Sequence, residues 1–510
     1  MSTTVSIKQL EQPWSAFTDQ IVLGKDLLEV VSTSMYVDPL CMYREYIQNA
    51  ADSIDDARQS AVLRKNDEGR VSIDIDRVSR TVRIRDNGAG LEAESFVRTI
   101  TAFGASKKRN SNQRGLRGIG RLSGLAYCQE LLFRSKQFGE RFSSEISWDC
   151  GRLKTLLRDP AYKGNLQDLL SECVTFRRTA ADPKDHFFEV ELRKVIRHGR
   201  DTLLNGDEIS RYLSQVAPVP FHPDFSHAEK IEPMLSQYVE MANLNISVSG
   251  VSESIVRPYR DQIVDSKGKQ LTLKDVELLT LPSVDCSSGA IVWLLHHTYE
   301  GAIRNDSVRG LRLRSGNIQI GNSEVLQSVF QEGRFNKWTV GEVHILDRRI
   351  APNARRDYCE QNVHLENLLN HLAPITQSIA KRARNASSHR NNLRHFTALE
   401  KSIFAGIAIL RQGSETPLAL KTRTEELAAS IQQLEKIAKK IDSAEKSEYA
   451  RRVSKLSKAL ARAKQQSPAG TKFLKKKNAL IYRKVFSLIY RHSSDQTSAR
   501  KLVEKMLKEL

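Results

Sequence analysis

The sequence has few of the features that mark secreted, membrane-spanning or P-loop proteins. Its 510 residues include six widely separated cysteines and no Cys-x-x-Cys pair. This excludes a disulfide framework and a cysteine-rich zinc site, and it predicts a reducing, cytoplasmic compartment. No run of about 18 consecutive apolar residues occurs, which argues against membrane insertion. The opening MSTTVSIKQLEQPW lacks a signal-peptide pattern, and the phosphate-binding motif G-x-x-x-x-G-K-[ST] is absent.

Positive charge is in excess and is unevenly distributed. The formal net charge is +19, and residues 381–510 contain 30 Lys and Arg against 11 Asp and Glu. Residues 1–380 contain 49 of each kind. This asymmetry indicates either a region that meets an acidic partner, such as duplex nucleic acid, or a lysine-rich helical region facing solvent.

The first part of the chain predicts an α/β sandwich. Residues 22–34 and 39–60 have helical patterns, and in the second of these four apolar residues share one face: Tyr43, Ile47, Ala50 and Ile54. Residues 71–76 and 81–85 alternate apolar and polar side chains around a short turn, which predicts a β-hairpin. Further strand-like stretches cover 131–148 and 187–196. A helix–helix–hairpin order favours a sandwich over a doubly wound parallel sheet.

The remaining chain predicts a second α/β region and then a helical one. Residues 225–375 mix short helices with strand-like segments such as 246–251 and 340–346. Two apolar runs follow with steps of four and three, starting at Leu427 and at Tyr449. They are out of phase, so they indicate either an interrupted coiled coil or two packed helices. Residues 465–471 have linker composition, and 472–510 predict a basic helical end.

Three segments carry residues with chemical potential. In the second predicted helix, Glu45, Asn49 and Asp52 share one face. Directly after the hairpin comes the glycine loop 86–90 (DNGAG), whose carboxylate can accept a hydrogen bond from an amine of a base. Glycines, Ser106 and Lys107 gather over 104–120, a composition that suits backbone contacts to phosphate.

Taken together, these segments resemble the ATP site of the gyrase, heat-shock protein 90, histidine kinase and MutL (GHKL) superfamily. Residues 27–57 in particular are similar to the opening helices of the heat-shock protein 90 chaperones. The resemblance implies a Bergerat-type α/β sandwich over 1–215 and a transducer-like α/β middle domain over 225–375. Residues 380–510 do not resemble the chaperone dimerisation domain and are expected to be an all-α, basic, partly coiled-coil region.

The resemblance also implies roles for single residues, with ATP and Mg²⁺ as cofactors. Glu45 takes the place of the general base, Asn49 that of the magnesium ligand, and Asp86 that of the adenine-binding aspartate. The other implied cofactor-binding residues are Asp52, Gly88, Gly90, Ser106, Lys107, Gly115, Gly118 and Gly120. The family usually has a threonine in a late strand, and residues 186–192 (HFFEVEL) offer no clear match.

A second catalytic residue is implied in the middle region. Residues 350–357 (IAPNARRD) resemble the loop that carries a catalytic arginine in the chaperones, which points to Arg356, with Arg355 as the neighbouring candidate. The alternative is a local ion pair with Asp357 or Asp347. The arginines of the nearby segment 309–314 alternate in a way that suits one solvated face of a sheet.

Three functions are compatible with these features. The first is a slow ATPase that resembles heat-shock protein 90, in which a lid over 99–121 closes and a homodimer cycles. The second is an ATP-gated clamp of the MutL or MORC type, with Lys475 to Lys477 among its contacts to duplex nucleic acid. The third is an ATP-binding component of a bacterial defence system. If the basic helices instead serve dimerisation, Ile431 and Leu434 are expected at the dimer interface.

Overall fold

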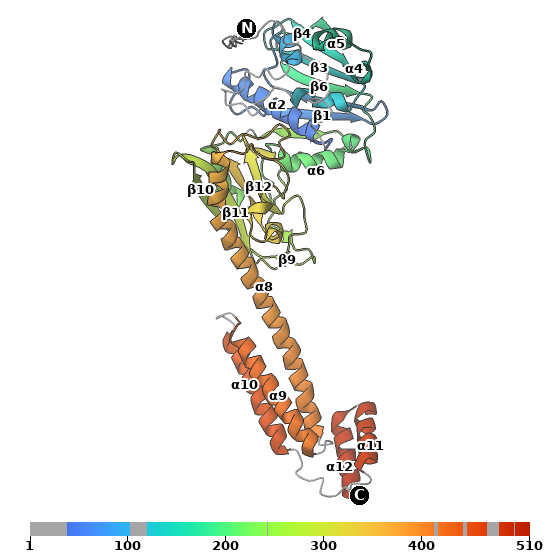
Figure 1. The fold of residues 1–510 in the computed structure, drawn as a ribbon, viewed down its shortest axis with the longest axis vertical. Coiled ribbons are helices and arrows are strands. Elements are labelled where there is room, and N and C mark those ends of the chain that lie inside the picture. The colour runs from blue at the N-terminus through green and yellow to red at the C-terminus, as the bar shows by residue number, and fades with distance from the viewer. Residues whose placement is uncertain are drawn as a thin grey trace, which may run out of the picture. The chain divides into compact units, whose positions relative to one another are not determined.

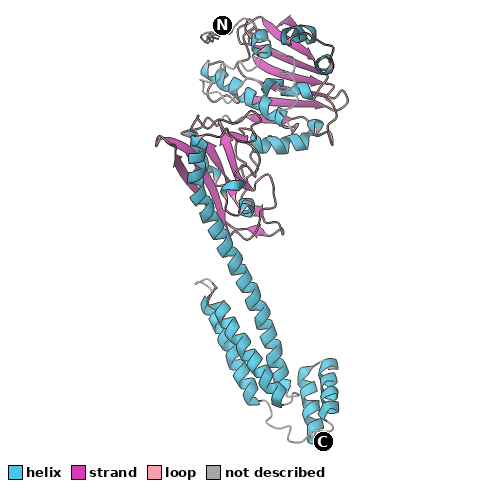
Figure 2. Cartoon of the chain, in the orientation of Figure 1, coloured by secondary structure: helices cyan, strands magenta, loops and turns pink. Residues whose placement is uncertain are grey.

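The computed structural model describes residues 38–102, 120–241, 243–412, 417–441, 446–466, 479–493 and 495–509. The chain divides into two compact units, residues 1–380 and 381–510 (Figure 1). The first unit contains two β-sheets, and the described part of the second unit is helical (Figure 2). Among the described residues, no helix is long and apolar enough to cross a membrane.

The first sheet has seven strands in the order β5-β4-β3-β6-β2-β1-β7. All neighbouring strands are antiparallel except β1 and β7, which are parallel. The predicted hairpin forms, with Ile73 of β1 opposite Ile84 of β2. The strands are β1 (Arg70–Asp76), β2 (Thr81–Asp86), β3 (Glu130–Lys136), β4 (Phe142–Asp149), β5 (Val174–Ala180), β6 (Phe187–Arg193) and β7 (Asn245–Val248).

Helices cover one face of this sheet, which gives the predicted α/β sandwich (Figure 2). Helix α2 (Cys41–Gln59) begins two residues after Pro39 and packs Tyr43, Ile47, Ala50 and Ile54 into the core, so the predicted apolar face is confirmed. The other helices are α3 (Phe96–Thr101), α4 (Cys150–Arg158), α5 (Leu166–Cys173), α6 (Gly206–Val216) and the 3-10 helices η2 (Gly120–Ala126) and η3 (Thr202–Leu204).

The opposite face of the first sheet carries alternating arginines and glutamates from neighbouring strands. At its centre, Arg134 of β3 lies 2.9 Å from Glu145 of β4 and 2.6 Å from both Glu189 and Glu191 of β6. Arg85 of β2 lies 3.2 Å from Glu189. Opposite charges on adjacent strands stabilise the pairing and leave this face electrostatically balanced.

A segment between α6 and β7 connects the two cores of the first unit. Helix α7 (Ala228–Ser236) and its neighbours pack Phe221, Phe225 and Leu235 against the second sheet. The chain then returns to the first sheet, where β7 pairs with β1. The sequence placed the strand-like segment 246–251 in the second region, and this was wrong because its backbone partner lies in the first sheet.

The second sheet has five strands in the order β10-β11-β14-β12-β13, and β12 and β14 are parallel. The strands are β10 (Leu273–Pro282), β11 (Ser288–His297), β12 (Gly310–Ser315), β13 (Ile318–Ile320) and β14 (Val340–Ile345), with a separate hairpin of β8 (Ile263–Val264) and β9 (Gln270–Leu271). Two short 3-10 helices, η4 (Gln327–Val329) and η5 (Gly333–Trp338), precede β14.

The second unit is built around a bundle of three helices. The later part of α8 (Val363–Gln412) packs with α9 (Pro417–Ala438) and α10 (Lys446–Gln466), and α11 (Ala479–His492) pairs with α12 (Gln496–Glu509). The two out-of-phase apolar runs are thus two packed helices, α9 and α10. Ile431 and Leu434 are buried inside this bundle of a single chain, so the expectation that they face a second copy was wrong.

Candidate active site

Glu45 lies on α2 with its carboxylate buried between three elements of the first unit. Its Oε1 is 3.3 Å from Nε of Arg356 and 3.4 Å from a terminal nitrogen of Arg44. Only 6% of the surface of Glu45 is exposed to solvent. A Cβ atom on Gly120, at the start of η2, would press against the same carboxylate, so Gly120 lies directly against Glu45. The structure therefore brings the predicted Glu45, Gly120 and Arg356 together.

Arg356 reaches Glu45 because the loop that carries it is fixed in an unusual conformation. Arg356 has φ +55°, a left-handed conformation that a non-glycine residue adopts only under constraint. Its carbonyl accepts hydrogen bonds from the backbone N–H of Gly321 (2.8 Å) and from Arg44 (3.4 Å). Arg44 also donates to the carbonyl of Arg355 at 3.0 Å. The Arg44 side chain of α2 thus holds the backbone of the loop that carries Arg356.

The neighbouring Arg355 is exposed, whereas Arg356 is largely buried. The local ion-pair alternative named Asp347, and that carboxylate is engaged by Arg349, at 2.8 Å. The other named carboxylate, Asp357, accepts a hydrogen bond from the side chain of Asn353 at 2.6 Å. Of the two candidate arginines, Arg356 is the one whose charged group meets Glu45.

Asp86 is the last residue of β2, and its carboxyl is buried. Its Oδ1 accepts a hydrogen bond from the backbone N–H of Gly88 at 2.8 Å. Burial raises the pKa of this carboxyl to about 7, while hydrogen bonds to Gly88, Ser53 and Phe188 oppose the shift. A buried acceptor that is half ionised near neutral pH suits a ligand that supplies its own N–H donor.

Gly88 and Gly90 are required by the protein itself. A Cβ atom on Gly88 would collide with Ser53 of α2, and one on Gly90 would collide with the carbonyl of Lys136. Gly90 also has φ +71°, which favours glycine. These two glycines let the loop pack closely against α2 and β3, and their predicted place beside a flat base stays a prediction.

Asn49 and Asp52 occupy the same side of α2 as Glu45, one and two turns further along. Asn49 is half-buried and Asp52 is buried. Strand β6, where the sequence offered no clear match to the late-strand threonine of the family, contains no threonine, and its Phe188 pairs with Asp86 of β2. The other predicted cofactor-binding residues, Ser106, Lys107, Gly115 and Gly118, lie outside the described residues.

Sequence reasoning missed a buried charged cluster in the second sheet. It assigned the arginines of 309–314 to a solvated face, yet Arg312 and Arg314 are each 1% exposed. Glu342 of β14 lies 2.7 Å from Arg314 and 2.8 Å from Arg257, and all three side chains are fully buried. The alternation in β12 was read correctly, but the face that carries the arginines packs against α6 and other strands. Only the glutamate inside the apolar strand VGEVHI hinted at this cluster.

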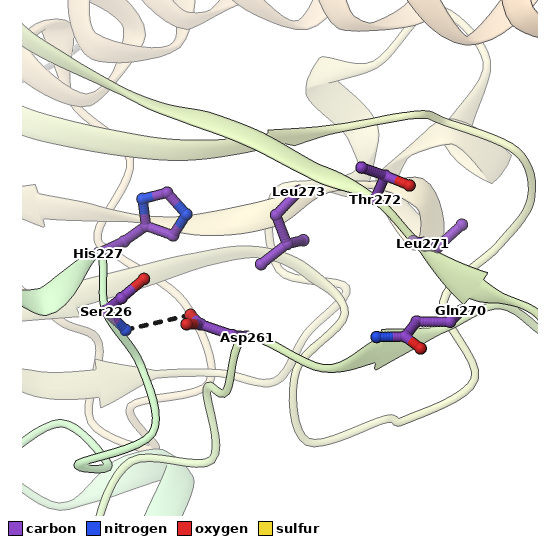
Figure 3. A pocket seen from close by; sticks show the side chains of 7 residues that line it. All are labelled: Ser226, His227, Asp261, Gln270, Leu271, Thr272 and Leu273. Atoms are coloured by element: carbon purple, nitrogen blue, oxygen red, sulfur yellow. Dashed lines mark hydrogen bonds between the residues drawn. The ribbon is translucent and has the colours of Figure 1, made fainter.

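A separate groove of about 440 Å³ lies where α7 meets β9 and β10 (Figure 3). The groove is lined by Ser226, His227, Asp261 and residues 270–273. Asp261 accepts a hydrogen bond from the backbone N–H of Ser226 at 3.1 Å, and no described residue hydrogen-bonds to the His227 ring. The groove shares no residue with the site around Glu45.

Comparison with known proteins finds a family model that matches the first part of the chain. Residues 43–159 match the family model described as histidine kinase-, DNA gyrase B-, and HSP90-like ATPase. This range includes Glu45, Asn49, Asp86 and the glycine segment up to Gly120. The chain carries a GHKL-type ATPase domain.

Curated relatives point to the heat-shock protein 90 branch of this superfamily. The chain is 30% identical over 142 residues to the chaperone protein HtpG of Coxiella burnetii, a match covering 24% of this chain and 22% of that protein. It is also 30% identical over 129 residues to HtpG of Fusobacterium nucleatum, covering 22% of this chain and 21% of that protein. The chain thus matches only about a fifth of the length of these relatives.

Proposed function

We propose that the protein hydrolyses ATP to ADP and phosphate and uses this reaction as a conformational switch. The observation that carries the proposal is the contact between Glu45 of the ATPase domain and Arg356 of the neighbouring sheet region, 3.3 Å apart. A carboxylate can orient and deprotonate water, and a guanidinium can stabilise the charge of a transferring phosphoryl group. The contact therefore joins both chemical requirements of hydrolysis in one place.

The residues present fit ATP and Mg²⁺ by the chemistry of their donor sets. Asp86 offers a buried acceptor for the exocyclic amine of adenine, and the amide oxygen of Asn49 is a ligand type that magnesium accepts beside phosphate oxygens. When bound, Mg²⁺ would neutralise phosphate charge. Glu45 would hold the attacking water and accept its proton.

Arg356 has two possible partners in this mechanism. Without nucleotide its Nε faces the Glu45 carboxylate. A γ-phosphate would compete for the guanidinium and leave the carboxylate to interact with water. Arg356 would thereby act mainly in the transition state, where interactions raise kcat.

We also propose that the segment 99–121 closes over bound nucleotide. Arg121 supports this because its guanidinium donates hydrogen bonds to the carbonyls of Thr99 and Ala102. Burial lowers the pKa of Arg121. The side chain thus ties together the two described ends of the segment.

A homodimer and a cytoplasmic location complete the proposal. The hairpin of α11 and α12 buries Phe486 and Val503 between its helices but leaves Ile481, Leu488 and Leu502 exposed, an apolar surface that a second copy could cover. All six cysteines are free, as a reducing compartment requires. Light scattering of a Leu488→Glu/Leu502→Glu variant tests the dimer, and an unchanged dimer mass would reject this surface.

Arg356→Ala in the full chain tests the proposed hydrolysis. We expect kcat to fall by roughly 10³-fold or more, the usual contribution of an arginine that contacts the transferring phosphoryl group. The Kd for nucleotide should stay within about twofold, because the contact strengthens only in the transition state. Arg355→Ala is the matched control. This exposed neighbour accepts a hydrogen bond from Arg44 through its backbone carbonyl, which the substitution leaves in place. An unchanged kcat in Arg356→Ala would reject the proposed role.

A second candidate function, nucleic-acid binding, is favoured by one surface of α10. Arg451, Lys455, Lys458 and Arg462 are exposed and recur at steps of four and three, on the side of the helix away from its buried residues. None of the four has an acidic partner among the described residues. At the C-terminal end of α9, by contrast, Lys439, one residue past the helix, pairs with Glu435 at 2.9 Å. A straight row of unpaired cations suits the phosphate backbone of a duplex without base readout.

This second candidate is tested with two variants that lose equal charge. Arg451→Gln/Lys455→Gln/Lys458→Gln should weaken duplex DNA binding and reduce its salt dependence by about three phosphate contacts. Lys436→Gln/Lys439→Gln/Lys440→Gln, in the last turn of α9 and directly after it, should have a smaller effect. Equal losses in both variants would mean that net charge, and not the α10 row, attracts the duplex. No binding by the parent chain at about 50 mM salt would end the clamp hypothesis.

A further inference from the structure

We propose that Arg312 and Gln319 are positioning residues for Arg356, and that they link the Arg356 loop to the end of helix α6 in the ATPase domain. The inference rests on the proposed role of Arg356 in hydrolysis. It concerns how the loop is held and not the chemistry itself. Neither residue touches Glu45 in the described structure, so both would act through Arg356.

The connection begins at Gln215 in the last turn of α6. Its side-chain oxygen accepts a hydrogen bond from Arg312 at 3.2 Å, and its backbone carbonyl accepts one from Arg314 at 2.6 Å. Both arginines lie on β12 of the second sheet. The C-terminal end of an ATPase-domain helix is thus held by two guanidinium groups from the neighbouring sheet.

From Arg312 the connection passes through Gln319 to the loop. The same terminal nitrogen of Arg312 donates to the side-chain oxygen of Gln319 at 2.9 Å. The side-chain nitrogen of Gln319 donates to the carbonyl of Gly321 at 3.0 Å. The backbone N–H of Gly321 donates to the carbonyl of Arg356 at 2.8 Å. Three consecutive hydrogen bonds therefore lead from Arg312 to Arg356.

Gly321 leaves this connection little freedom. It has φ +63°, and a Cβ atom at this position would press against the carbonyl of Asp357 and the side chain of Val325. The turn therefore packs directly against the Arg356 loop, with no space for a side chain between them. A shift of Gly321 would move the carbonyl of Arg356, and with it a residue already held in the left-handed region.

The hydrogen-bond partners of Arg312 indicate that its buried guanidinium fixes the positions of neighbouring groups. No carboxylate among the described residues forms a hydrogen bond or ion pair with its guanidinium. Its other terminal nitrogen donates to the carbonyls of Asp306 (2.7 Å) and Arg309 (3.3 Å). Burial lowers its pKa. A buried cation held only by neutral acceptors is expensive to maintain, and the planar fork of arginine can satisfy four acceptors at fixed angles.

The connection closes a ring with helix α2. Tyr43 of α2 donates a hydrogen bond to the carbonyl of Leu203, just before α6, at 2.6 Å. At the other end of the ring, Arg44 and Glu45 of α2 contact the Arg356 loop. The loop is thus held from two sides by the same ATPase domain. This arrangement would set the distance between Arg356 and the phosphate end of a bound nucleotide.

The test replaces Gln319 by residues that break the connection. Gln319→Met has similar length and removes both hydrogen bonds, and we expect kcat to fall about tenfold with nucleotide Kd unchanged within twofold. Gln319→Glu keeps an acceptor for Arg312 but loses the donor to Gly321, so it should show the same loss while its ion pair with Arg312 preserves folding. Thr339→Val is the control, because it removes one buried hydrogen bond, to the carbonyl of Phe335, away from the connection.

A double-mutant cycle with Arg356→Ala separates positioning from general destabilisation. If Gln319 acts through Arg356, Gln319→Met should lower kcat no further in the Arg356→Ala background. A tenfold loss in both backgrounds, or an unchanged kcat in both Gln319 variants, would overturn the inference while leaving the role of Arg356 intact. An unchanged kcat in Arg356→Ala alone would instead reject the proposed function on which the inference depends.

Discussion

Arg356 lies 3.3 Å from Glu45 although 310 residues separate them in the chain. One residue belongs to a helix of the first sheet region and the other to a loop beyond the last strand of the second sheet. Arg44, next to Glu45, holds that loop through two backbone carbonyls. Two adjacent residues of α2 thus contact the loop. Glu45 pairs with the side chain of Arg356, and Arg44 hydrogen-bonds to the loop backbone.

Glu45→Ala should retain nucleotide binding and lose turnover. A general base contributes roughly 10²–10⁴-fold to the rate, and its removal leaves the adenine contacts in place. Steady-state phosphate release and a fluorescent-nucleotide titration measure the two quantities. Asp74→Ala, which removes an exposed carboxylate of β1, is the control. Parental turnover in Glu45→Ala would place the base elsewhere.

Asp86→Asn should abolish nucleotide binding at ordinary concentrations. The amide presents an N–H group where the base needs an acceptor, and losing a charge-assisted hydrogen bond corresponds to about 1.5–3 kcal/mol, or more than tenfold in Kd. Calorimetric titration measures the loss, with circular dichroism to verify folding. Unchanged affinity in a folded variant would reject the adenine assignment.

Nucleotide binding should release protons near neutral pH. The pKa of Asp86 is about 7, so about half of the free protein carries a proton there, and an amine donor favours the ionised form. Titrations in two buffers of different ionisation enthalpy should show release of about half a proton at pH 7 and almost none near pH 8.5. Because folding raises this pKa, the contribution of Asp86 to stability is present below about pH 4 and is lost as the pH rises towards 7.

Asn49→Ala should weaken the magnesium dependence of binding. The variant removes an amide oxygen, while the adenine contact at Asp86 remains. We expect the affinity gain on adding Mg²⁺, measured as the ratio of Kd values with and without the ion, to shrink by about tenfold. A parental ratio would show that another group holds the metal.

Glu342→Gln should destabilise the second sheet region strongly. The variant leaves Arg257 and Arg314 buried without a carboxylate, and breaking a buried ion pair in this way costs about 3–5 kcal/mol. The urea midpoint of the full chain should fall. Asp275→Asn breaks the exposed pair with Lys230 and should leave the midpoint unchanged. Equal midpoints for Glu342→Gln and the parent would contradict the burial of this cluster.

The sequence by itself determined the local elements of the ATPase domain. The apolar period of 39–60 specified the buried face of α2, and the alternation of 71–85 specified the hairpin. The positions of Glu45, Asn49 and Asp86 followed from these elements, because spacing along a helix and the end of a strand are properties of local backbone geometry. The family model and the relatives match this same part of the chain.

Tertiary structure alone decided which distant segments meet. Nothing in the alternation of residues 309–314 distinguishes a solvated face from one packed against α6, and the structure buries Arg312 and Arg314 there. The strand at 245–248 could not be assigned to a sheet, because its partner β1 lies far away in the sequence. The sequence alone also could not show that Ser53 of α2 packs directly against Gly88. Long-range packing, which no local period encodes, places Arg356 against Glu45.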